Sequence, residues 1–336
     1  MDFRYTDEQQ AMQATLRRFI ARDYGFEQRR ALSGSEAGYS SQAWGQYAEL
    51  GLLALPLPEA FGGLGGNGVD IMIVMEQVGR GLLLEPYLTT VVLCAGLLAD
   101  AATPAMQQAL LPRVAAGELK LALAAYEPAG RYELNRLATT ATRSAKGWQL
   151  SGLKAVVLDA PSADFFIVSA RESGARDATQ GVTLFLVPRD APGLTVAGYP
   201  TQSGGRAGDL QLVDVAVGAD TVIGAAGQGL APLEKAVDGA IAALCAEALG
   251  IMSALNQATL AYLKSRKQFG VAIGSFQALQ HRMAEMYIAE EQARSMAIIA
   301  AVNVSAADAA VRRAVARRLP SSGPRGWAWW RWRSRR

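Results

Sequence analysis

The spacing of apolar residues changes twice along this chain, and this change limits the fold more than any other feature. From residue 1 to about 115, apolar side chains recur at helical spacing, as at Leu16, Phe19 and Ile20. Residues 118–224 instead hold short runs rich in β-branched and aromatic residues, divided by turn residues. After that stretch the helical spacing returns. The order helical, β, helical predicts an α+β chain whose helices and strands occupy separate domains.

Several helices can be placed from this spacing and from capping residues. Thr6 is expected to cap the first helix, because the acids Asp7 and Glu8 follow it in the first turn. Ser275 stands where it would cap the last long helix. The other expected helices cover residues 41–50, 69–79, 87–99, 104–117, 230–267, 276–303 and 305–318.

The middle part is expected to form a small antiparallel β-barrel or sandwich, because short strands alternate with turn residues there. The expected strands cover residues 119–126, 138–143, 148–150, 155–158, 165–170, 182–187, 194–199 and 209–217. The predicted domains are an N-terminal helical domain at 1–117, a β domain at 118–224, an incomplete C-terminal helical bundle at 225–318 and a disordered Arg/Trp-rich tail at 319–336.

Charge and cysteine content bear on the compartment and the partners. The net charge of +3 is misleading, since residues 317–336 hold seven arginines and no acid, and without those seven charges the net charge is −4. Cys94 and Cys245 lie in apolar helical patterns, which is typical of reduced core residues and favours the cytoplasm. The start has no secretory pattern, and charges such as Glu247 interrupt the apolar runs before membrane-spanning length. The single histidine, His281, leaves no His-based metal site or Ser-His-Asp triad.

The segment between the last two long helices, residues 264–282, carries an unusual set of side chains. Arg266 offers a planar fork for phosphate, and Phe269 offers a flat ring. Gln268 and Gln277 add amide groups. Together these residues suit a molecule that has a diphosphate and aromatic rings. The alternative is an ordinary helix–loop–helix with surface charges.

This segment also resembles that of a known family. The phrase Arg266-x-Gln268-Phe269-Gly270-x-x-Ile273-x-x-Phe276-Gln277 resembles the flavin-contacting signature of the acyl-CoA dehydrogenases. The glycine-rich phrase at residues 58–66 resembles the same family, whose architecture is also helical, then β, then helical. The resemblance covers residues 1 to about 316. Within the family, the phrases that begin at Tyr47 and Ile241 resemble the small-subunit type of pimeloyl-CoA dehydrogenase.

The resemblance implies FAD-dependent α,β-dehydrogenation of an acyl-CoA thioester. A carboxylate base takes the α-proton, and the flavin takes the β-hydride. It implies that Arg266 pairs with the FAD diphosphate, that Phe269 packs against the cofactor and that Gln277 reaches its adenine end, with Gln268 beside them. In the family these residues serve the flavin of a neighbouring subunit, which implies a homo-oligomer, or a hetero-oligomer with a large subunit. The implied electron acceptor is an electron-transfer flavoprotein.

In the β domain the resemblance points to Tyr126, Glu127 and Val156 as flavin contacts, although the residue types differ from the family pattern. Tyr126-Glu127-Pro128 stands where the family has Thr-Glu-Pro, and the serine that follows in the family is missing. Val156-Val157-Leu158 stands where the family has Trp-x-Thr. The flavin hydrogen bonds of this chain therefore cannot be the family's usual set.

The family's base position in the long helix is Ala240 here, and an alanine cannot accept a proton. Asp238 is near in sequence but points away on a helix. Glu247 lies seven residues after Ala240, on nearly the same face and about 10 Å further along the axis. Glu247 is our candidate base; the alternative is a buried glutamate paired with a neighbouring helix or subunit.

Two other features admit a structural explanation. The glycines at 63, 65 and 68 form a literal GxGxxG, but a loop rather than a strand precedes them, so we reject a dinucleotide fold there. Arg206 falls where the family has an arginine, and a structural role is expected for it.

The tail at 319–336 and the missing base leave alternatives open. The tail holds four of the six tryptophans, and suits a nucleic-acid arm or a membrane-surface segment. We favour a reading-frame shift that truncates the family sequence, because the composition changes abruptly. We therefore expect neither nucleic acid nor membrane as a partner. The alternative functions are a non-catalytic partner subunit that lends flavin contacts to a neighbour, and an inactive truncated product.

Overall fold

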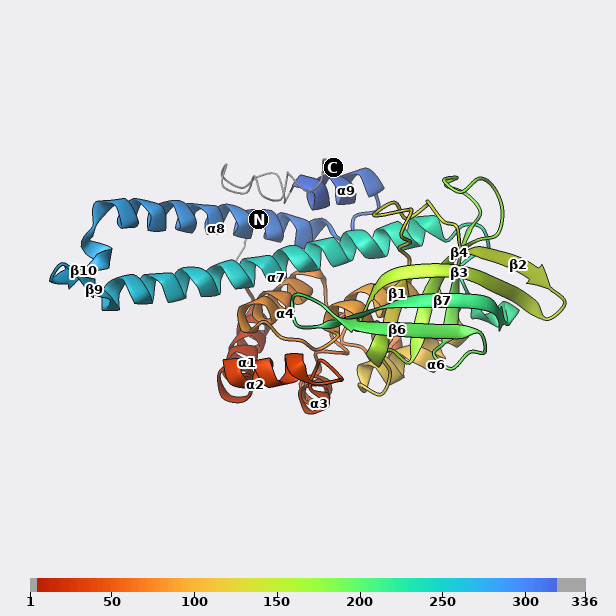
Figure 1. The fold of residues 1–336 in the computed structure, drawn as a ribbon, viewed down its shortest axis with the longest axis horizontal. Helices are drawn as coiled ribbons and strands as arrows, with labels where there is room; N and C mark the ends of the chain where they lie inside the picture. The colour runs from red at the N-terminus through yellow and green to blue at the C-terminus, as the bar shows by residue number, and fades with distance from the viewer. Residues whose placement is uncertain (1–4, 319–336) are drawn as a thin grey trace. The chain divides into compact units, whose positions relative to one another are not determined.

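The structure is a computed structural model that describes residues 5–318 (Figure 1). The chain divides into two compact units. Of the described residues, one comprises 5–25, 67–83 and 241–318, and the other comprises 26–66 and 84–240. The predicted tail at 319–336 lies outside the described residues.

The first unit is helical. Its described helices are α1 (Asp7–Asp23), α4 (Gly68–Gly81), the larger part of α7 (Leu230–Ser265), α8 (Gln277–Asn303) and α9 (Ala309–Arg318). Thr6 caps α1 as predicted: its hydroxyl accepts a hydrogen bond from the Gln9 amide, and the Gln9 side chain accepts one from the Thr6 amide. Asn67 and Asp70 form the equivalent pair at the start of α4.

Two glycines let α4 and α7 approach closely. A Cβ atom built on Gly79 would lie 1.9 Å from the Glu247 carbonyl oxygen, and one on Gly250 would lie 1.9 Å from the Glu76 carbonyl oxygen. The two helix backbones are therefore in direct contact, which any larger side chain at either glycine would prevent.

A buried polar network joins α4, α7 and α8 in the same unit. The Arg294 guanidinium lies 3.3 Å from Glu76 and 3.2 Å from Glu290. The second Glu290 oxygen accepts a hydrogen bond of 2.7 Å from Asn256. Because both glutamates are buried, this arginine supplies the countercharge that makes their burial tolerable.

The second unit begins with helices α2 (Phe26–Gly34), α3 (Ser41–Glu49), α5 (Gly96–Ala101) and α6 (Pro104–Ala115), a 3₁₀ turn η1 (Glu59–Phe61) and a π-helix η2 (Leu88–Ala95). The single helix expected over 87–99 is thus a π-helix followed by α5. Helix α2 was not predicted because it has no buried residue and hence no apolar stripe. The GxGxxG glycines follow η1 rather than a strand, which confirms the rejection of a dinucleotide fold there.

The rest of this unit is an eight-stranded sheet in the order β6-β7-β3-β2-β4-β5-β8, with β1 beside β4. The strands are β1 (Leu121–Ala124), β2 (Thr140–Ser144), β3 (Gly147–Leu158), β4 (Phe165–Arg171), β5 (Val182–Pro188), β6 (Leu194–Pro200), β7 (Arg206–Val217) and β8 (Val222–Ile223). Most pairings are antiparallel as predicted, but β1 and β2 each pair with β4 in parallel. The runs predicted at 148–150 and 155–158 are one strand, β3, whose register against β7 shifts twice. Such irregularities bend a strand and redirect its side chains.

The segment that joins α7 and α8 differs from the prediction at both ends. Helix α7 ends at Ser265, and β9 (Lys267–Gln268) and β10 (Val271–Ala272) form a small antiparallel hairpin, followed by the 3₁₀ turn η5 (Ile273–Ser275). Ser275 does not cap α8: its hydroxyl donates to the Ala272 carbonyl, and Phe276, which precedes the helix, makes no side-chain cap. The hydroxyl is taken by the 3₁₀ turn, which sequence spacing alone did not reveal.

Helix α7 is long and apolar enough, by length and composition, to cross a membrane. We predicted that Glu247 would interrupt this apolar stretch. Its one charge does not, because the helix remains long and apolar enough to span a membrane. A core helix of a soluble protein has the same composition, so this property alone assigns no membrane.

Candidate functional site

The predicted nucleotide contacts Arg266, Gln268, Phe269 and Gln277 lie together around the β9–β10 hairpin, in the first unit. All four are exposed. The Phe269 ring is 92% exposed and packs edge-on against Phe276, with ring centroids 6.3 Å apart. A guanidinium, two amides and an exposed ring at one tip form a donor set suited to a flavin dinucleotide.

The backbone of Phe269 is the unusual feature of this tip. Phe269 and Gly270 have φ angles of +53° and +82°, as in a two-residue hairpin turn of type I′. Glycine adopts such angles freely, but for a phenylalanine the left-handed conformation is less stable by roughly 1–2 kcal/mol. A strained aromatic residue that remains exposed is more typical of a ligand contact than of a packing residue.

Glu127 lies in the second unit, and its carboxylate accepts three hydrogen bonds from the protein. One oxygen lies 2.7 Å from the Lys154 ammonium and accepts from the Thr139 amide at 3.1 Å, and the other accepts from the Ala138 amide at 2.6 Å. Burial raises the pKa of Glu127, but Lys154 and these donors outweigh it, so the pKa lies below its usual value. In this arrangement Glu127 fixes the loop between β1 and β2, and the protein occupies three of the roughly four acceptor sites of the carboxylate.

Lys154 is a residue that the sequence reasoning missed. It is fully buried on β3, and burial lowers its pKa to about 8 against the attraction of Glu127. A signal existed: Trp148 and Leu150 point into the core, and strand alternation places residue 154 on their face. A lysine there requires a buried acid.

Tyr126 and Val156 lie close to this ion pair. The Tyr126 carbonyl accepts a hydrogen bond of 2.9 Å from the Ala155 amide. The Val156 side chain is 56% exposed, its φ is +54°, and its amide donates to Asp209 at 3.0 Å. The Val156 amide is therefore already used, and the side chain offers only apolar surface.

Glu247, the candidate base, lies on α7 in the first unit. It is half-buried, and burial raises the pKa of its carboxyl. Ala240, at the family's base position, is buried and has no proton-accepting group. Glu247 shares its unit with the β9–β10 hairpin, whereas Tyr126, Glu127 and Val156 belong to the other unit.

Arg206 has the structural role that was expected. Its guanidinium donates to the carbonyl oxygens of Ser33, Ser35 and Glu36, so it holds the end of α2 and the loop after it. The Cβ position of Gly38 also lies against this side chain.

Asp159 is a second residue that was missed. It follows β3 in a left-handed conformation and accepts a hydrogen bond of 2.6 Å from the Thr89 hydroxyl in the π-helix η2. Burial raises the pKa of Asp159 to about 6, and the Thr89 hydroxyl partly opposes this. Nothing in the local spacing indicates this contact, because 70 residues separate the partners.

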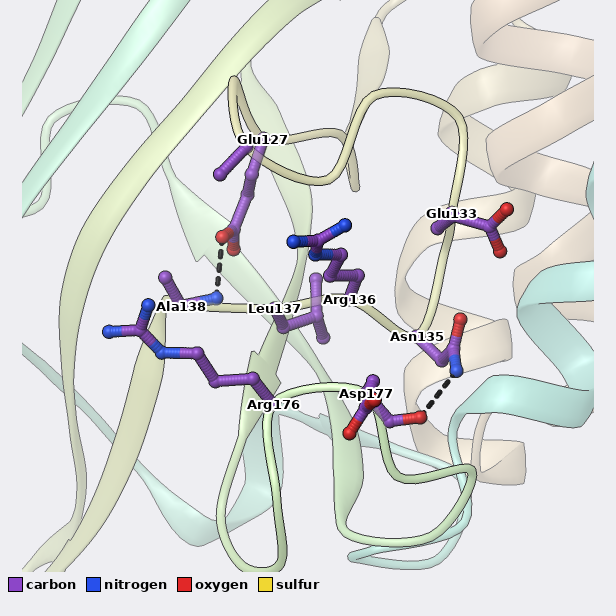
Figure 2. A pocket seen from close by; sticks show the side chains of 9 residues that line it. Glu127, Glu133, Asn135, Arg136, Leu137, Ala138, Arg176 and Asp177 are labelled. Atoms are coloured by element: carbon purple, nitrogen blue, oxygen red, sulfur yellow. Dashed lines mark hydrogen bonds between the residues drawn. The ribbon is translucent and has the colours of Figure 1, made fainter.

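A pocket of about 570 Å³ opens between the β1–β2 and β4–β5 loops (Figure 2). Its lining includes the Glu127 carboxylate, which accepts a hydrogen bond from the Ala138 amide, and the Asn135 side chain, which donates one to the Asp177 carbonyl. Arg136 and Arg176 line it from the two loops.

The residues present fit FAD in one unit and depart from the family in the other. The hairpin tip supplies a cation, amides and a ring that is exposed despite its backbone strain. In the β domain, Glu127 and the Val156 amide are engaged within the protein, so contacts there rest on Tyr126 and on the apolar Val156 side chain.

Comparison with family models covers nearly the whole chain. Residues 6–118 match the acyl-CoA dehydrogenase N-terminal domain, residues 122–215 the middle domain and residues 227–317 the C-terminal domain. A probable acyl-CoA dehydrogenase of Bacillus subtilis strain 168, YngJ, is 30% identical over 306 residues, which is 90% of this chain and 80% of that protein.

Solved structures share the fold. The FAD complex of PigA has a TM-score of 0.86 and 25% identity, over 95% of this chain and 84% of that one. The ChsE4-ChsE5 complex of Mycobacterium tuberculosis has a TM-score of 0.84 and 28% identity, over 96% and 84% of the chains.

Proposed function

Because this chain belongs to the acyl-CoA dehydrogenase family, we propose that it catalyses FAD-dependent α,β-dehydrogenation of an acyl-CoA thioester. The α+β fold of a helical, a β and a second helical part is that of the family, and the activity class is oxidoreductase. The single observation that carries the cofactor assignment is the hairpin tip, where Phe269 is held exposed and strained beside Arg266, Gln268 and Gln277.

FAD is the cofactor that this tip suits, as the FAD complex of a structural neighbour supports. Arg266 would pair with the diphosphate, Phe269 would pack against the cofactor, and Gln277 would meet the adenine end. When bound, FAD would supply the acceptor for the hydride, which carries both of the electrons that leave the substrate.

The α-proton requires a base, and Glu247 is the carboxylate that we propose. Its raised pKa makes it a stronger base than an exposed glutamate, as removal of a weakly acidic proton needs. The alternative is a non-catalytic partner subunit that lends Arg266, Phe269 and Gln277 to a neighbour's flavin, and the alanine at position 240 favours it.

The partners follow from the same premise. We propose a homo-oligomer, or a hetero-oligomer with a large subunit of the pimeloyl-CoA dehydrogenase type, and the two-component ChsE4-ChsE5 complex supports such pairing. The acceptor would be an electron-transfer flavoprotein. We propose a cytoplasmic location, because Cys94 and Cys245 are free thiols.

The cofactor assignment is tested by the flavin content of purified protein. Arg266→Gln removes the cation and is expected to lower bound FAD, measured by flavin absorbance per chain, while Arg282→Gln, at an exposed arginine of α8, keeps it. Equal flavin content in the two variants would reject the assignment.

The catalytic assignment is tested with a panel of acyl-CoA thioesters and an artificial electron acceptor. Glu247→Gln is expected to lose turnover and to retain FAD. Turnover that persists in Glu247→Gln, or that appears only when a large subunit is co-expressed, would favour the partner-subunit alternative.

A further inference from the structure

The end of α7, the β9–β10 hairpin and the first half of α8 form an arm, residues 257–289, in which no residue is buried. The hairpin, with the proposed FAD contacts, lies at the far end of this arm (Figure 1). At the near end, the root, Asn256 on α7 and Glu290 on α8 are both buried and share a hydrogen bond of 2.7 Å. The direction of the arm is therefore set at the root.

Four polar side chains from three helices meet at the root and form what we call the root cluster: Glu76 on α4, Asn256 on α7, and Glu290 and Arg294 on α8. The Arg294 guanidinium bridges the two glutamates at 3.3 and 3.2 Å. Glu76, Asn256 and Glu290 are at most 8% exposed. A buried charge that loses its partner is costly, so these contacts resist any movement of α8 that would separate them.

The other buried residues of α8 are all alanines, and they give little resistance to sliding. Along this helix alanine recurs every four residues, close to one helical turn, at positions 289, 293, 297 and 301. Sliding α8 by one turn would therefore place one alanine where another had been. Near the end of the helix, the Ala301 carbonyl faces Gly68 of α4, which has no side chain to interlock with it.

The root cluster, in contrast, fits only one position of α8. After a slip of one turn, Met286 or Arg294 would stand opposite Asn256 in place of Glu290. The slip would also part Arg294 from Glu76, whose buried carboxylate would lose its countercharge. Buried polar pairs are best attested in proteins as devices that fix the register of packed helices.

We propose that the root cluster is a register lock that positions the tip of the arm for FAD, an inference that rests on the proposed function of the tip. Gln277 precedes Glu290 by 13 residues, or about 20 Å along a helix, so a slip or tilt of α8 at the root is amplified at the tip. The residues of the root cluster act through the arm and are positioning residues.

The lock is tested in the absence of FAD by the distance between two spin labels in the first unit. The labels are placed at exposed alanines, Ala14→Cys in α1 and Ala284→Cys in α8. The parent protein carries Cys245→Ala, whereas Cys94 is buried and stays. Labelled chains are diluted with unlabelled ones, so that only distances within a chain are measured. One narrow distance distribution is expected for the parent.

The variant Glu76→Leu/Asn256→Leu/Glu290→Leu/Arg294→Met removes the polar groups of the root cluster and leaves none of its charges unpaired. Replacing buried ion pairs in this way is often neutral for stability, but the register is no longer specified. The distance distribution should broaden, or shift by about one turn, roughly 5 Å. A distribution equal to that of the parent would overturn the proposal.

The matched control is Arg282→Gln/Glu285→Gln, which removes an exposed ion pair of the same helix and should leave the distance unchanged. Should the four-residue variant not fold, Asn256→Leu/Glu290→Leu decides in the same way, because it keeps Arg294 paired with Glu76.

FAD affinity gives a second readout. The four-residue variant should bind FAD roughly 5- to 150-fold more weakly, the usual range for coupling between separate sites, with its melting temperature retained. Glu290→Gln still offers Asn256 an acceptor and should keep both the distance and the affinity. A broadened distance with unchanged FAD affinity would overturn the positioning role. If the parent binds no FAD, the proposed function of the tip fails, and the spin distances alone decide the lock.

Discussion

The Glu127 carboxylate accepts three hydrogen bonds, and all of them come from the protein: the Lys154 ammonium and the amides of Ala138 and Thr139. A buried ion pair contributes little net stability, but removing one partner is costly because the other charge stays buried and unpaired. We expect Lys154→Met to lower the free energy of unfolding by about 3–5 kcal/mol. Urea unfolding followed by circular dichroism measures this.

The matched control for this prediction is the double variant Lys154→Met/Glu127→Gln, which removes both charges. It should recover at least half of the loss, since no buried charge is left unpaired. A Lys154→Met protein with wild-type stability would show that Glu127 finds another countercharge or takes up a proton at little cost.

Asp159 is expected to make the stability depend on pH. Its pKa is raised to about 6 in the fold, mainly by burial, so the folded chain holds this proton at pH values where the unfolded chain has lost it. The proton therefore stabilises the fold at low pH, and this contribution is lost as the pH rises through about 6. Asp159→Asn can still accept the Thr89 hydrogen bond and should flatten the fall in melting temperature between about pH 4 and 6.5. An unchanged pH profile in Asp159→Asn would assign the dependence to other groups.

Among the helices, the contact between α4 and α7 depends on two missing side chains. A methyl group at Gly79 or Gly250 would lie 1.9 Å from a backbone oxygen of the facing helix, and a backbone cannot yield as a flexible side chain does. We expect Gly79→Ala and Gly250→Ala each to lower the unfolding free energy by about 2 kcal/mol or more, through overpacking. Thermal unfolding measures the change.

Gly45→Ala in α3 is the control, because no atom lies within 4 Å of its added Cβ. The better helix propensity of alanine should there raise stability by roughly 0.5–1 kcal/mol. Wild-type stability in the Gly79→Ala variant would show that α4 and α7 can move apart without a loss of unfolding free energy.

These elements also show what the sequence could and could not predict. Helices with an apolar stripe, such as α1 and α4, were placed within a few residues, because the spacing of apolar residues shows which face is buried. Helix α2 and the β9–β10 hairpin were missed, since neither buries a residue that spacing would reveal.

At the candidate site the same limit applies to long-range contacts. Arg266, Phe269 and Gln277 are near in sequence, so their meeting at one tip followed from the chain itself. The Glu127–Lys154 pair and the Thr89–Asp159 hydrogen bond join residues 27 and 70 positions apart. The register shift of β3 beyond Lys154 sets which side chains face the core, and no local sequence pattern indicates this shift.

For the molecule as a whole, the apolar surface of α8 predicts association between chains. The side chains of Tyr287 and Ile288 are 60% and 55% exposed, and they line a shallow hollow of about 330 Å³ with Glu291, Gln292 and Ser295. Ile299 and Val302, further along the same helix, are 43% and 48% exposed. A row of large apolar side chains of this kind marks an interaction surface more often than a solvent-facing one.

We therefore expect the protein to elute as a dimer or larger assembly in size-exclusion chromatography with light scattering, whether with itself or with a co-expressed subunit. Tyr287→Lys/Ile288→Lys introduces two charges on this surface and should shift the mass toward one chain, because burying unpaired charges in an apolar interface costs several kcal/mol. Leu153→Lys/Val213→Lys places the same charges on exposed apolar positions of the sheet and should leave the mass unchanged. If FAD is held between protomers, as the proposed roles of Arg266 and Phe269 require, the α8 variant should lose flavin together with mass. Loss of mass with full retention of flavin would show instead that a single chain holds the cofactor.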